Sequence, residues 1–184
     1  MNKNITGVVM AGGKSSRMGI DKGLMDFKGK PMVQYAIDLL SGIFESVVIS
    51  SNNHAYEKFG LKLIPDIHVN CGPIGGLHAV LSTLPTKYAF ILGCDMPFVN
   101  NKVIELLVES LNYELLVVPE VDGNFEPLCA LYNASLFGEL GKRIQLGNFK
   151  MHHFIRSTNP KIQVKFERKF FININTPSDL KQGR

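Results

Sequence analysis

ITGVVMAGGKSSRMGIDK, residues 5–22, is the stretch that decides the fold. Its first six residues are apolar in their second half, as expected of a strand that is covered on both faces. The run ends in Ala11-Gly12-Gly13 and passes into a loop that carries basic residues up to Lys22. Open α/β sheets bind ligands just beyond the carboxyl ends of their strands. The stretch therefore predicts an α/β protein with a binding loop after its first strand.

The rest of the chain alternates short β-branched runs with amphipathic stretches, the pattern of parallel strands joined by crossover helices. We expect strands at residues 5–10, 46–50, 61–64, 88–92 and 115–118, an extended segment at 126–132, and helices at 31–40, 75–84, 101–111 and 134–144. These elements predict a three-layer αβα, Rossmann-like α/β fold with a mostly parallel twisted sheet. At 184 residues the chain has the length of one domain, residues 1–184.

The last third of the chain is less regular. Residues 162–166 and 170–174 are two apolar runs separated by Glu167-Arg168-Lys169. We expect them to pair as strands, or the second to extend the main sheet. Thr176-Pro177-Ser178-Asp179 combines a capping residue, a proline at the first helical position and an acid, so a short helix should begin there.

The composition points to a soluble globular protein, because 45% of the residues are hydrophobic and 20% are charged. The formal charge is +4, but the basic residues are scattered, which favours a small anionic ligand over nucleic acid. No apolar stretch approaches the length of a membrane span, and the N-terminal run is too short for a signal peptide. We expect a cytoplasmic protein that binds neither nucleic acid nor membrane.

The sequence shows no disulfide or metal framework. Cys71, Cys94 and Cys129 are odd in number, widely spaced and without a CxxC pair, which is typical of a reducing compartment. The five histidines form no metal-ligand pattern, so we expect them at the surface or in packing.

The loop at residues 10–22 has the chemistry of a phosphate-binding loop. Gly12 and Gly13 let the backbone approach an anion closely, and Arg17 and Lys22 add positive charge. On the glycines alone, an ordinary strand-to-helix turn would look the same. A P-loop is excluded because its first glycine would fall on Val8, and a dinucleotide fingerprint is excluded because Arg17 follows where its third glycine belongs. The loop predicts binding of the phosphates of a nucleoside triphosphate.

Two aspartates follow predicted strands. Asp95 lies just beyond residues 88–92, where a carboxylate can hold Mg²⁺ against a triphosphate, although a turn aspartate before Pro97 would also fit. Asp66 follows Pro65 and could be no more than a turn former, as the segment 72–76 could be a turn that enters a helix.

Motifs of one known family run through nearly the whole chain. They are Met10-Ala11-Gly12-Gly13, Arg17-Met18-Gly19, Asp21-Lys22-Gly23-Leu24, Gly29-Lys30-Pro31, Asp66, Gly72-Pro73, Gly76, Cys94-Asp95-Met96-Pro97-Phe98, Glu126-Pro127-Leu128, Ala130-Leu131-Tyr132, Asn173, Asn175-Thr176-Pro177 and Asp179-Leu180. In order and spacing they resemble the nucleotidyltransferases with an A-[AG]-G-x-x-x-R-M-G signature, and within these the molybdenum cofactor guanylyltransferases.

The resemblance implies the nucleotide-diphospho-sugar transferase fold and an enzyme that transfers GMP from GTP to molybdenum-loaded molybdopterin. The products are the guanine dinucleotide cofactor and pyrophosphate. It implies catalytic roles for Arg17, Lys22 and Asp95, with Asp95 holding Mg²⁺. It implies GTP contacts at Met10, Ala11, Gly12, Gly13, Lys22, Asp66 and Asp95, and a molybdopterin side at Asn173 and Asn175.

The same resemblance leaves alternatives open. The loop is shared with cytidylyl and sugar-nucleotide transferases, and a non-catalytic nucleotide-binding cofactor chaperone would also keep it. Ser50 stands where close relatives are expected to have an asparagine, for which Asn52 or Asn53 could substitute. Partners of such an enzyme would include molybdenum-insertion and cofactor-delivery proteins.

Overall fold

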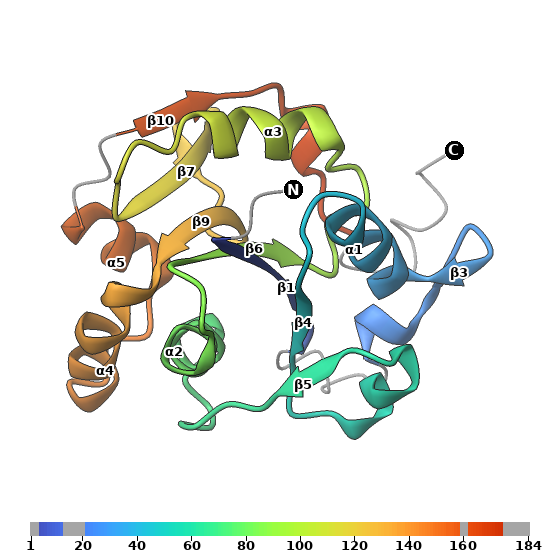
Figure 1. Ribbon diagram of the computed structural model, residues 1–184, viewed down its shortest axis with the longest axis horizontal. Helices are drawn as coiled ribbons and strands as arrows, with labels where there is room; N and C mark the ends of the chain where they lie inside the picture. The colour runs from blue at the N-terminus through green and yellow to red at the C-terminus, as the bar shows by residue number, and fades with distance from the viewer. Residues whose placement is uncertain (1–3, 13–20, 159–161, 175–184) are drawn as a thin grey trace.

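The computed structural model describes residues 4–12, 21–158 and 162–174. In this part of the chain seven strands form one twisted sheet in the order β10-β7-β9-β6-β1-β4-β5, and β8 adds to β7 (Figure 1). Neighbours on this path are parallel, except that β9 runs antiparallel to β6 and β7. The strands are β1 (Ile5–Met10), β4 (Val47–Ser50), β5 (Lys62–Ile64), β6 (Tyr88–Gly93), β7 (Leu116–Val121), β8 (Asn124–Phe125), β9 (Cys129–Asn133) and β10 (Ile162–Lys165), with β2 (Asp26–Phe27) and β3 (Lys30–Pro31) forming a separate hairpin.

Helices cover both faces of the sheet, which gives the expected three-layer αβα architecture. Residues of α1 and α3 belong to one hydrophobic cluster, and residues of α2, α4 and α5 belong to another on the opposite face (Figure 1). None of the helices in the described part is long and apolar enough to cross a bilayer. The helices are α1 (Met32–Ser41), α2 (Pro73–Thr83), α3 (Asn101–Glu109), α4 (Phe137–Gln145) and α5 (Met151–Ser157), with 3₁₀ turns η2 (Lys22–Leu24), η3 (His54–Phe59), η4 (Ala134–Leu136) and η5 (Arg168–Phe171).

The central strand β6 shows why this sequence forms a sheet buried on both faces. All six of its residues are buried. Phe90 and Leu92 contribute to the cluster under α1 and α3, whereas Ala89 and Ile91 contribute to the cluster under α2. Successive side chains of a strand point to opposite faces, so a continuous apolar run supplies both layers at once.

Most of the expected elements are confirmed with shifts of one to a few residues at their ends. Asn100 caps α3, because its side chain accepts a hydrogen bond from the Val103 N–H at 3.2 Å. Asn133 also acts as a cap, but of the short turn η4, and α4 begins only at Phe137. The turn η3 and the helix α5 were not expected, although Met151, Phe154 and Ile155 have the helical spacing of a buried face.

The expected strand at residues 170–174 is wrong. That segment contains η5, and β10 alone extends the main sheet by pairing in parallel with β7. Phe171 and Ile174 are the buried residues of the segment. Phe171 ends η5 and Ile174 lies three residues further on in irregular chain, whereas a strand would bury every second residue. The helix expected from Thr176 lies outside the described residues.

Candidate functional site

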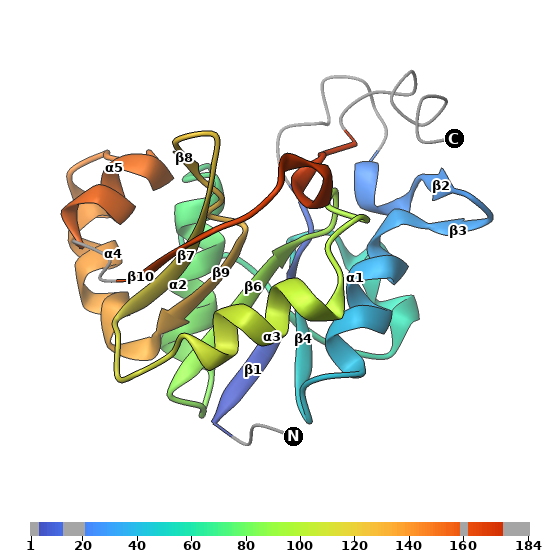
Figure 2. The same ribbon diagram turned by 90° about the horizontal axis from the view of Figure 1, so that it is seen from above.

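The carboxyl ends of three parallel strands meet at one edge of the sheet, which lies uppermost in Figure 2. The register pairs Met10 at the end of β1 with Ser50 of β4 and with Gly93 of β6. Two backbone hydrogen bonds continue this register beyond the strands: Ala11 N–H donates to Ser50 O at 2.9 Å, and Cys94 N–H donates to Met10 O at 3.0 Å. The segments that follow β1, β4 and β6 are therefore held side by side.

The loop after β1 begins with a backbone conformation that suits glycine alone. Gly12 has a φ of +133°, which L-amino acids rarely adopt, so the turn requires a residue without a Cβ. Ala11 before it is buried. Gly13 and Arg17 lie outside the described residues, and their contacts with a nucleotide stay predictions.

Lys22 and Asp95 are far apart in the sequence, but the charge of Lys22 acts on the Asp95 carboxylate. Asp95 is half-buried just beyond β6, and burial raises its pKa above the ordinary aspartate value. The Lys22 ammonium acts in the opposite direction and lowers the pKa of Asp95. The roles predicted for Lys22 and Asp95 in GTP transfer stay predictions.

Asp66 is joined to Asn52 by two hydrogen bonds. Asn52 Nδ2 donates to Asp66 Oδ2 at 3.1 Å, and Asp66 N–H donates to Asn52 Oδ1 at 2.7 Å. Burial raises the pKa of Asp66, and the bond from Asn52 only partly offsets this. Of the two asparagines after β4, Asn52 therefore brings an amide to Asp66, whereas Asn53 donates to Asp21 Oδ2 at 2.9 Å.

The helix α2 approaches Asp66 closely because two of its first residues are glycines. A Cβ on Gly76 would lie 3.3 Å from Asp66 Oδ1, and one on Gly75 would lie 2.8 Å from the backbone oxygen of His68. Gly72 has a φ of +60° and directly precedes α2, so the expected turn into a helix is confirmed. The glycines leave space beside the Asp66 carboxylate that larger residues would fill.

A cavity of about 350 Å³ opens beside Asp95. Its wall is formed by the start of α2, the region of β8, the segment before β9 and the start of α5. Asn173 lies in this wall, and the neighbouring Ile174 N–H donates to Asp95 O at 3.0 Å. Asn175 lies outside the described residues.

Glu126 is a second carboxylate in this cavity, and sequence reasoning assigned it no role of its own. Burial raises its pKa; the charge of Arg168 lowers it and the charge of Asp95 raises it further. The backbone around it is fixed, since Glu126 N–H donates to Pro119 O at 3.0 Å and Cys129 N–H donates to Glu126 O at 3.1 Å. The Glu-Pro-Leu motif was the signal that could have identified it.

The site contains no activated sulfur nucleophile. Burial raises the pKa of the Cys94 thiol to about 12, so it stays protonated at neutral pH. Cys71 and Cys129 are buried free thiols as well.

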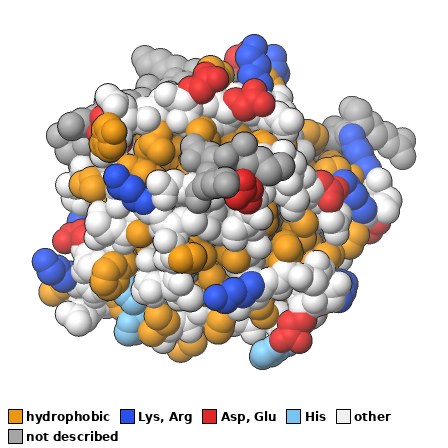
Figure 3. Space-filling model, in the orientation of Figure 1, with side chains coloured by type: hydrophobic (Ala, Val, Ile, Leu, Met, Phe, Trp, Pro, Cys, Tyr) orange, Lys and Arg blue, Asp and Glu red, His pale blue; other side chains and the backbone are white. Residues whose placement is uncertain are grey.

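The charges on the face shown in Figure 3 are interspersed, with basic and acidic side chains alternating rather than forming a band.

Asp95 is the residue that fits a divalent cation best. Among the described residues no three His, Cys, Asp or Glu side chains gather into a metal site. Mg²⁺ needs no such cage, because it is commonly bound by one or two carboxylates together with substrate phosphates and water. Asp95 supplies one such desolvated carboxylate at the end of β6.

Comparison with known proteins gives concordant results. Residues 7–162 match the family model described as the MobA-like NTP transferase domain. The chain is 37% identical to the molybdenum cofactor guanylyltransferase of Yersinia pestis, over 97% of this chain and 94% of that protein. It is 30% identical to a protein of Natranaerobius thermophilus named as a probable molybdenum cofactor guanylyltransferase, over 100% and 97%. The crystal structure of molybdopterin-guanine dinucleotide biosynthesis protein A from Archaeoglobus fulgidus superimposes with a TM-score of 0.76 at 26% identity, over 96% and 95% of the two chains.

Proposed function

This chain belongs to the MobA-like NTP transferase family, and we propose that it transfers GMP from GTP to the terminal phosphate of molybdenum-loaded molybdopterin. The reaction forms the guanine dinucleotide cofactor and releases pyrophosphate. The observation that supports the proposal is the carboxyl edge of β1 and β6, where the Gly12 turn and Asp95 follow neighbouring strands, the Lys22 charge acts on Asp95, and a cavity lies beside it.

The proposed chemistry requires little from acid and base groups. The acceptor is a phosphate that is already ionised at neutral pH, and its oxygen attacks the α-phosphorus of GTP while the bond to the β-phosphate oxygen breaks. Pyrophosphate leaves with the bonding electron pair. The barrier lies in bringing anions together and in stabilising the leaving group, so positioning and positive charge are what the protein must supply.

The residues at the sheet edge divide these tasks. Met10, Ala11 and Gly12 are the proposed GTP contacts at the end of β1, and Lys22 is proposed to neutralise phosphate charge, with Gly13 and Arg17 expected to supply further contacts and charge. Asp95 would hold Mg²⁺, which when bound neutralises negative charge on the triphosphate and the leaving pyrophosphate.

Asp66 is the proposed contact with the guanine base. The N1–H and the 2-amino group of guanine are two adjacent donors, and a carboxylate can accept from both together. Asn52 holds one oxygen of Asp66 at 3.1 Å, which sets the orientation of the carboxylate.

The cavity beside Asp95 is the proposed acceptor site. Its volume of about 350 Å³ lies within the range of small-molecule sites. Asn173 in its wall and Asn175 beyond it are proposed to contact the pterin side of the acceptor. Proteins that insert molybdenum and deliver the finished cofactor are the expected partners.

Purified protein incubated separately with GTP, CTP and UTP, together with Mg²⁺ and loaded molybdopterin, tests the proposal by pyrophosphate release. Release with GTP is the expected result, and calorimetric titration with Mg²⁺ should show that binding of GTP depends on the cation. Preference for CTP would indicate the cytidylyl transferase alternative. Binding of GTP without pyrophosphate release would indicate the non-catalytic chaperone.

A further inference from the structure

Asp21 directly precedes Lys22, and its carboxylate accepts three hydrogen bonds. Tyr56 Oη donates to Oδ1 at 2.5 Å, and Gly23 N–H donates to the same oxygen at 3.1 Å. Asn53 Nδ2 donates to Oδ2 at 2.9 Å. Both carboxylate oxygens therefore accept hydrogen bonds, from the backbone just after Lys22 and from two side chains of the segment 53–56.

The two side-chain donors are themselves rigidly placed. Tyr56 is fully buried and belongs to the hydrophobic cluster under α1 and α3. Asn53 caps η3 by accepting from Ala55 N–H at 3.0 Å, and its own N–H donates to Ser51 Oγ at 3.1 Å. Ser51 directly follows β4, so these contacts connect Asp21 to the carboxyl end of that strand.

The chain next to Lys22 passes through a narrow space. A Cβ on Gly23 would lie 2.3 Å from Tyr56 Oη and 3.2 Å from Cys94 Sγ, so only glycine fits between these two side chains. Cys94 precedes Asp95, and the Lys22 charge lowers the pKa of both. The backbone at Lys22 is thus held between Tyr56 on one side and the end of β6 on the other.

A carboxylate at this place needs a positive reason, because it adds negative charge near the proposed triphosphate site. Three hydrogen bonds to one charged group are directional and strong enough to fix a backbone segment. Catalysis by charge neutralisation depends on groups that are in place before the reaction, and a displacement of about 1 Å can cost about 10²-fold in rate.

We propose that Asp21 is a positioning residue that, with Tyr56 and Asn53, fixes the backbone at Lys22 so that its ammonium is directed to the transferred phosphate. The inference rests on the proposed function, since it assigns Lys22 to that reaction. Asp21 itself touches no reacting atom. Its effect on turnover passes through Lys22.

A double-mutant cycle on kcat tests this, because coupled residues give non-additive effects. Tyr56→Phe removes the 2.5 Å bond to Asp21 while keeping the buried ring, and should lower kcat about 10-fold. Lys22→Ala should lower it about 10²- to 10³-fold. In the Lys22→Ala background, Tyr56→Phe should change kcat by less than about twofold, because the residue that it positions is gone.

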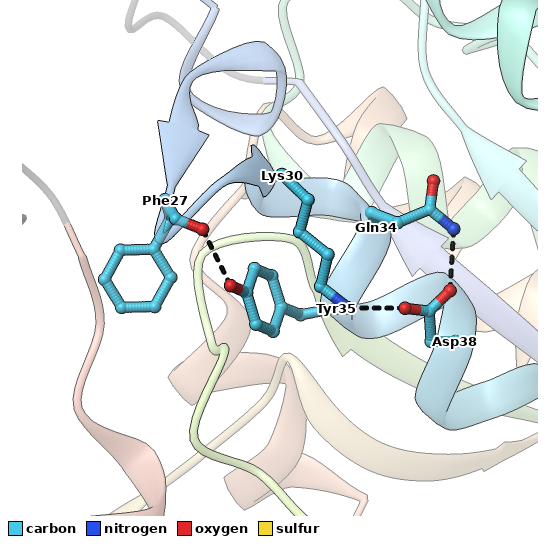
Figure 4. Close-up of polar contacts among 5 residues, drawn as sticks. All are labelled: Phe27, Lys30, Gln34, Tyr35 and Asp38. Atoms are coloured by element: carbon cyan, nitrogen blue, oxygen red, sulfur yellow. Dashed lines mark hydrogen bonds and ion pairs between the residues drawn. The ribbon is translucent and has the colours of Figure 1, made fainter.

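Tyr35→Phe is the matched control. Tyr35 Oη donates to Phe27 O at 2.7 Å and so fastens the β2–β3 hairpin to α1 through a bond of the same kind (Figure 4). No hydrogen bond of the structure connects Tyr35 to Asp21 or to Asn53 within the described residues. The kcat of Tyr35→Phe should therefore stay within about twofold of the wild-type value. Asp21→Asn is a second variant in case Tyr56→Phe folds poorly, as checked by circular dichroism.

Two results would overturn the inference. One is a wild-type kcat in Tyr56→Phe or Asp21→Asn; the other is an equal loss from Tyr56→Phe whether or not Lys22 is present, which indicates a general structural role. Failure of the proposed function looks different, since the wild-type protein would then release no pyrophosphate from GTP and acceptor. In that case the inference is tested by the rise in Tm that GTP and Mg²⁺ cause on binding. This rise should be smaller in Tyr56→Phe and Lys22→Ala than in the wild type, and unchanged in Tyr35→Phe. An undiminished rise in Tyr56→Phe would overturn the inference.

Discussion

Asp66→Asn should remove the preference for guanine without harming the fold. The Asp66 carboxylate accepts one hydrogen bond from Asn52, and the glycines of α2 leave space at its other oxygen. Guanine offers two donors to that carboxylate, whereas an asparagine at this position offers one acceptor and turns an N–H₂ group toward the base. Inosine triphosphate, which lacks the 2-amino group, isolates one of the two contacts.

The magnitude follows from the bond that the 2-amino group makes. A hydrogen bond to a charged partner contributes about 1.5–3 kcal/mol. Since 1.4 kcal/mol is about tenfold, the wild-type protein should prefer GTP over inosine triphosphate by roughly 10- to 150-fold in kcat/KM. In Asp66→Asn the preference should fall below about threefold.

The thermal stability of Asp66→Asn should not fall with the loss of guanine preference. Burial raises the pKa of Asp66, so the folded protein binds this proton more tightly than the unfolded chain does. The resulting contribution to the free energy of unfolding is present below the ordinary pKa of 3.8 and is lost as the pH rises through the raised value. At pH 7 the ionised carboxylate therefore destabilises the fold, and Asp66→Asn should leave Tm unchanged or raise it.

The assay is pyrophosphate release with each nucleotide across a pH series. The guanine preference of the wild type should decline as the pH falls toward the raised pKa of Asp66, because a protonated carboxyl group presents a donor to the base. Asp38→Asn is the control. Asp38 lies on the exposed side of α1, where it accepts hydrogen bonds from Gln34 Nε2 at 2.7 Å and from Lys30 (Figure 4). The preference for guanine should persist in this variant. An undiminished preference for GTP in Asp66→Asn would refute the assignment of the base contact.

Three further variants test other parts of the structure. Lys22→Ala should lower kcat about 10²- to 10³-fold and change the free energy of unfolding by less than about 0.5 kcal/mol; unchanged turnover would remove Lys22 from the mechanism. Gly138→Ala places a Cβ of α4 in open space and should raise the free energy of unfolding in urea by about 0.5–1 kcal/mol. Gly75→Ala should lower it by about 1–3 kcal/mol, because its Cβ would lie 2.8 Å from His68 O. A change of the same sign in both variants would contradict this geometry. Burial lowers the pKa of His78, and the charge of the neighbouring His68 lowers it further. The unfolded chain therefore binds the His78 proton more readily than the folded protein, and the free energy of unfolding falls as the pH drops below the ordinary histidine pKa of 6.5. His78→Leu should flatten the pH dependence of Tm in that range, and an equally steep dependence would exclude His78 as its source.

The strands and the glycine turn that opens the loop after β1 could be predicted because their signals are local. The apolar runs of β1 and β6 are short and bounded by glycine, and the backbone angle of Gly12 follows from the kind of residue that the turn admits. The segment at residues 170–174 was mistaken for a strand because a short apolar run does not reveal its period. In the folded chain Phe171 packs into the interior at the end of η5, and Ile174 is buried beyond the turn.

By itself the sequence determined the α/β class and the glycine turn after β1, and it proposed Lys22 and Asp95 as charged groups of a site. Only the tertiary structure decided which of these groups meet and what holds them. Asp21 contacts Tyr56 and Asp66 contacts Asn52, because the order β1-β4-β5 places the segments that follow these strands at one edge of the sheet. The conformation of a turn depends on its own residues, but contacts between distant segments depend on strand order and register, which the packing of the whole core selects.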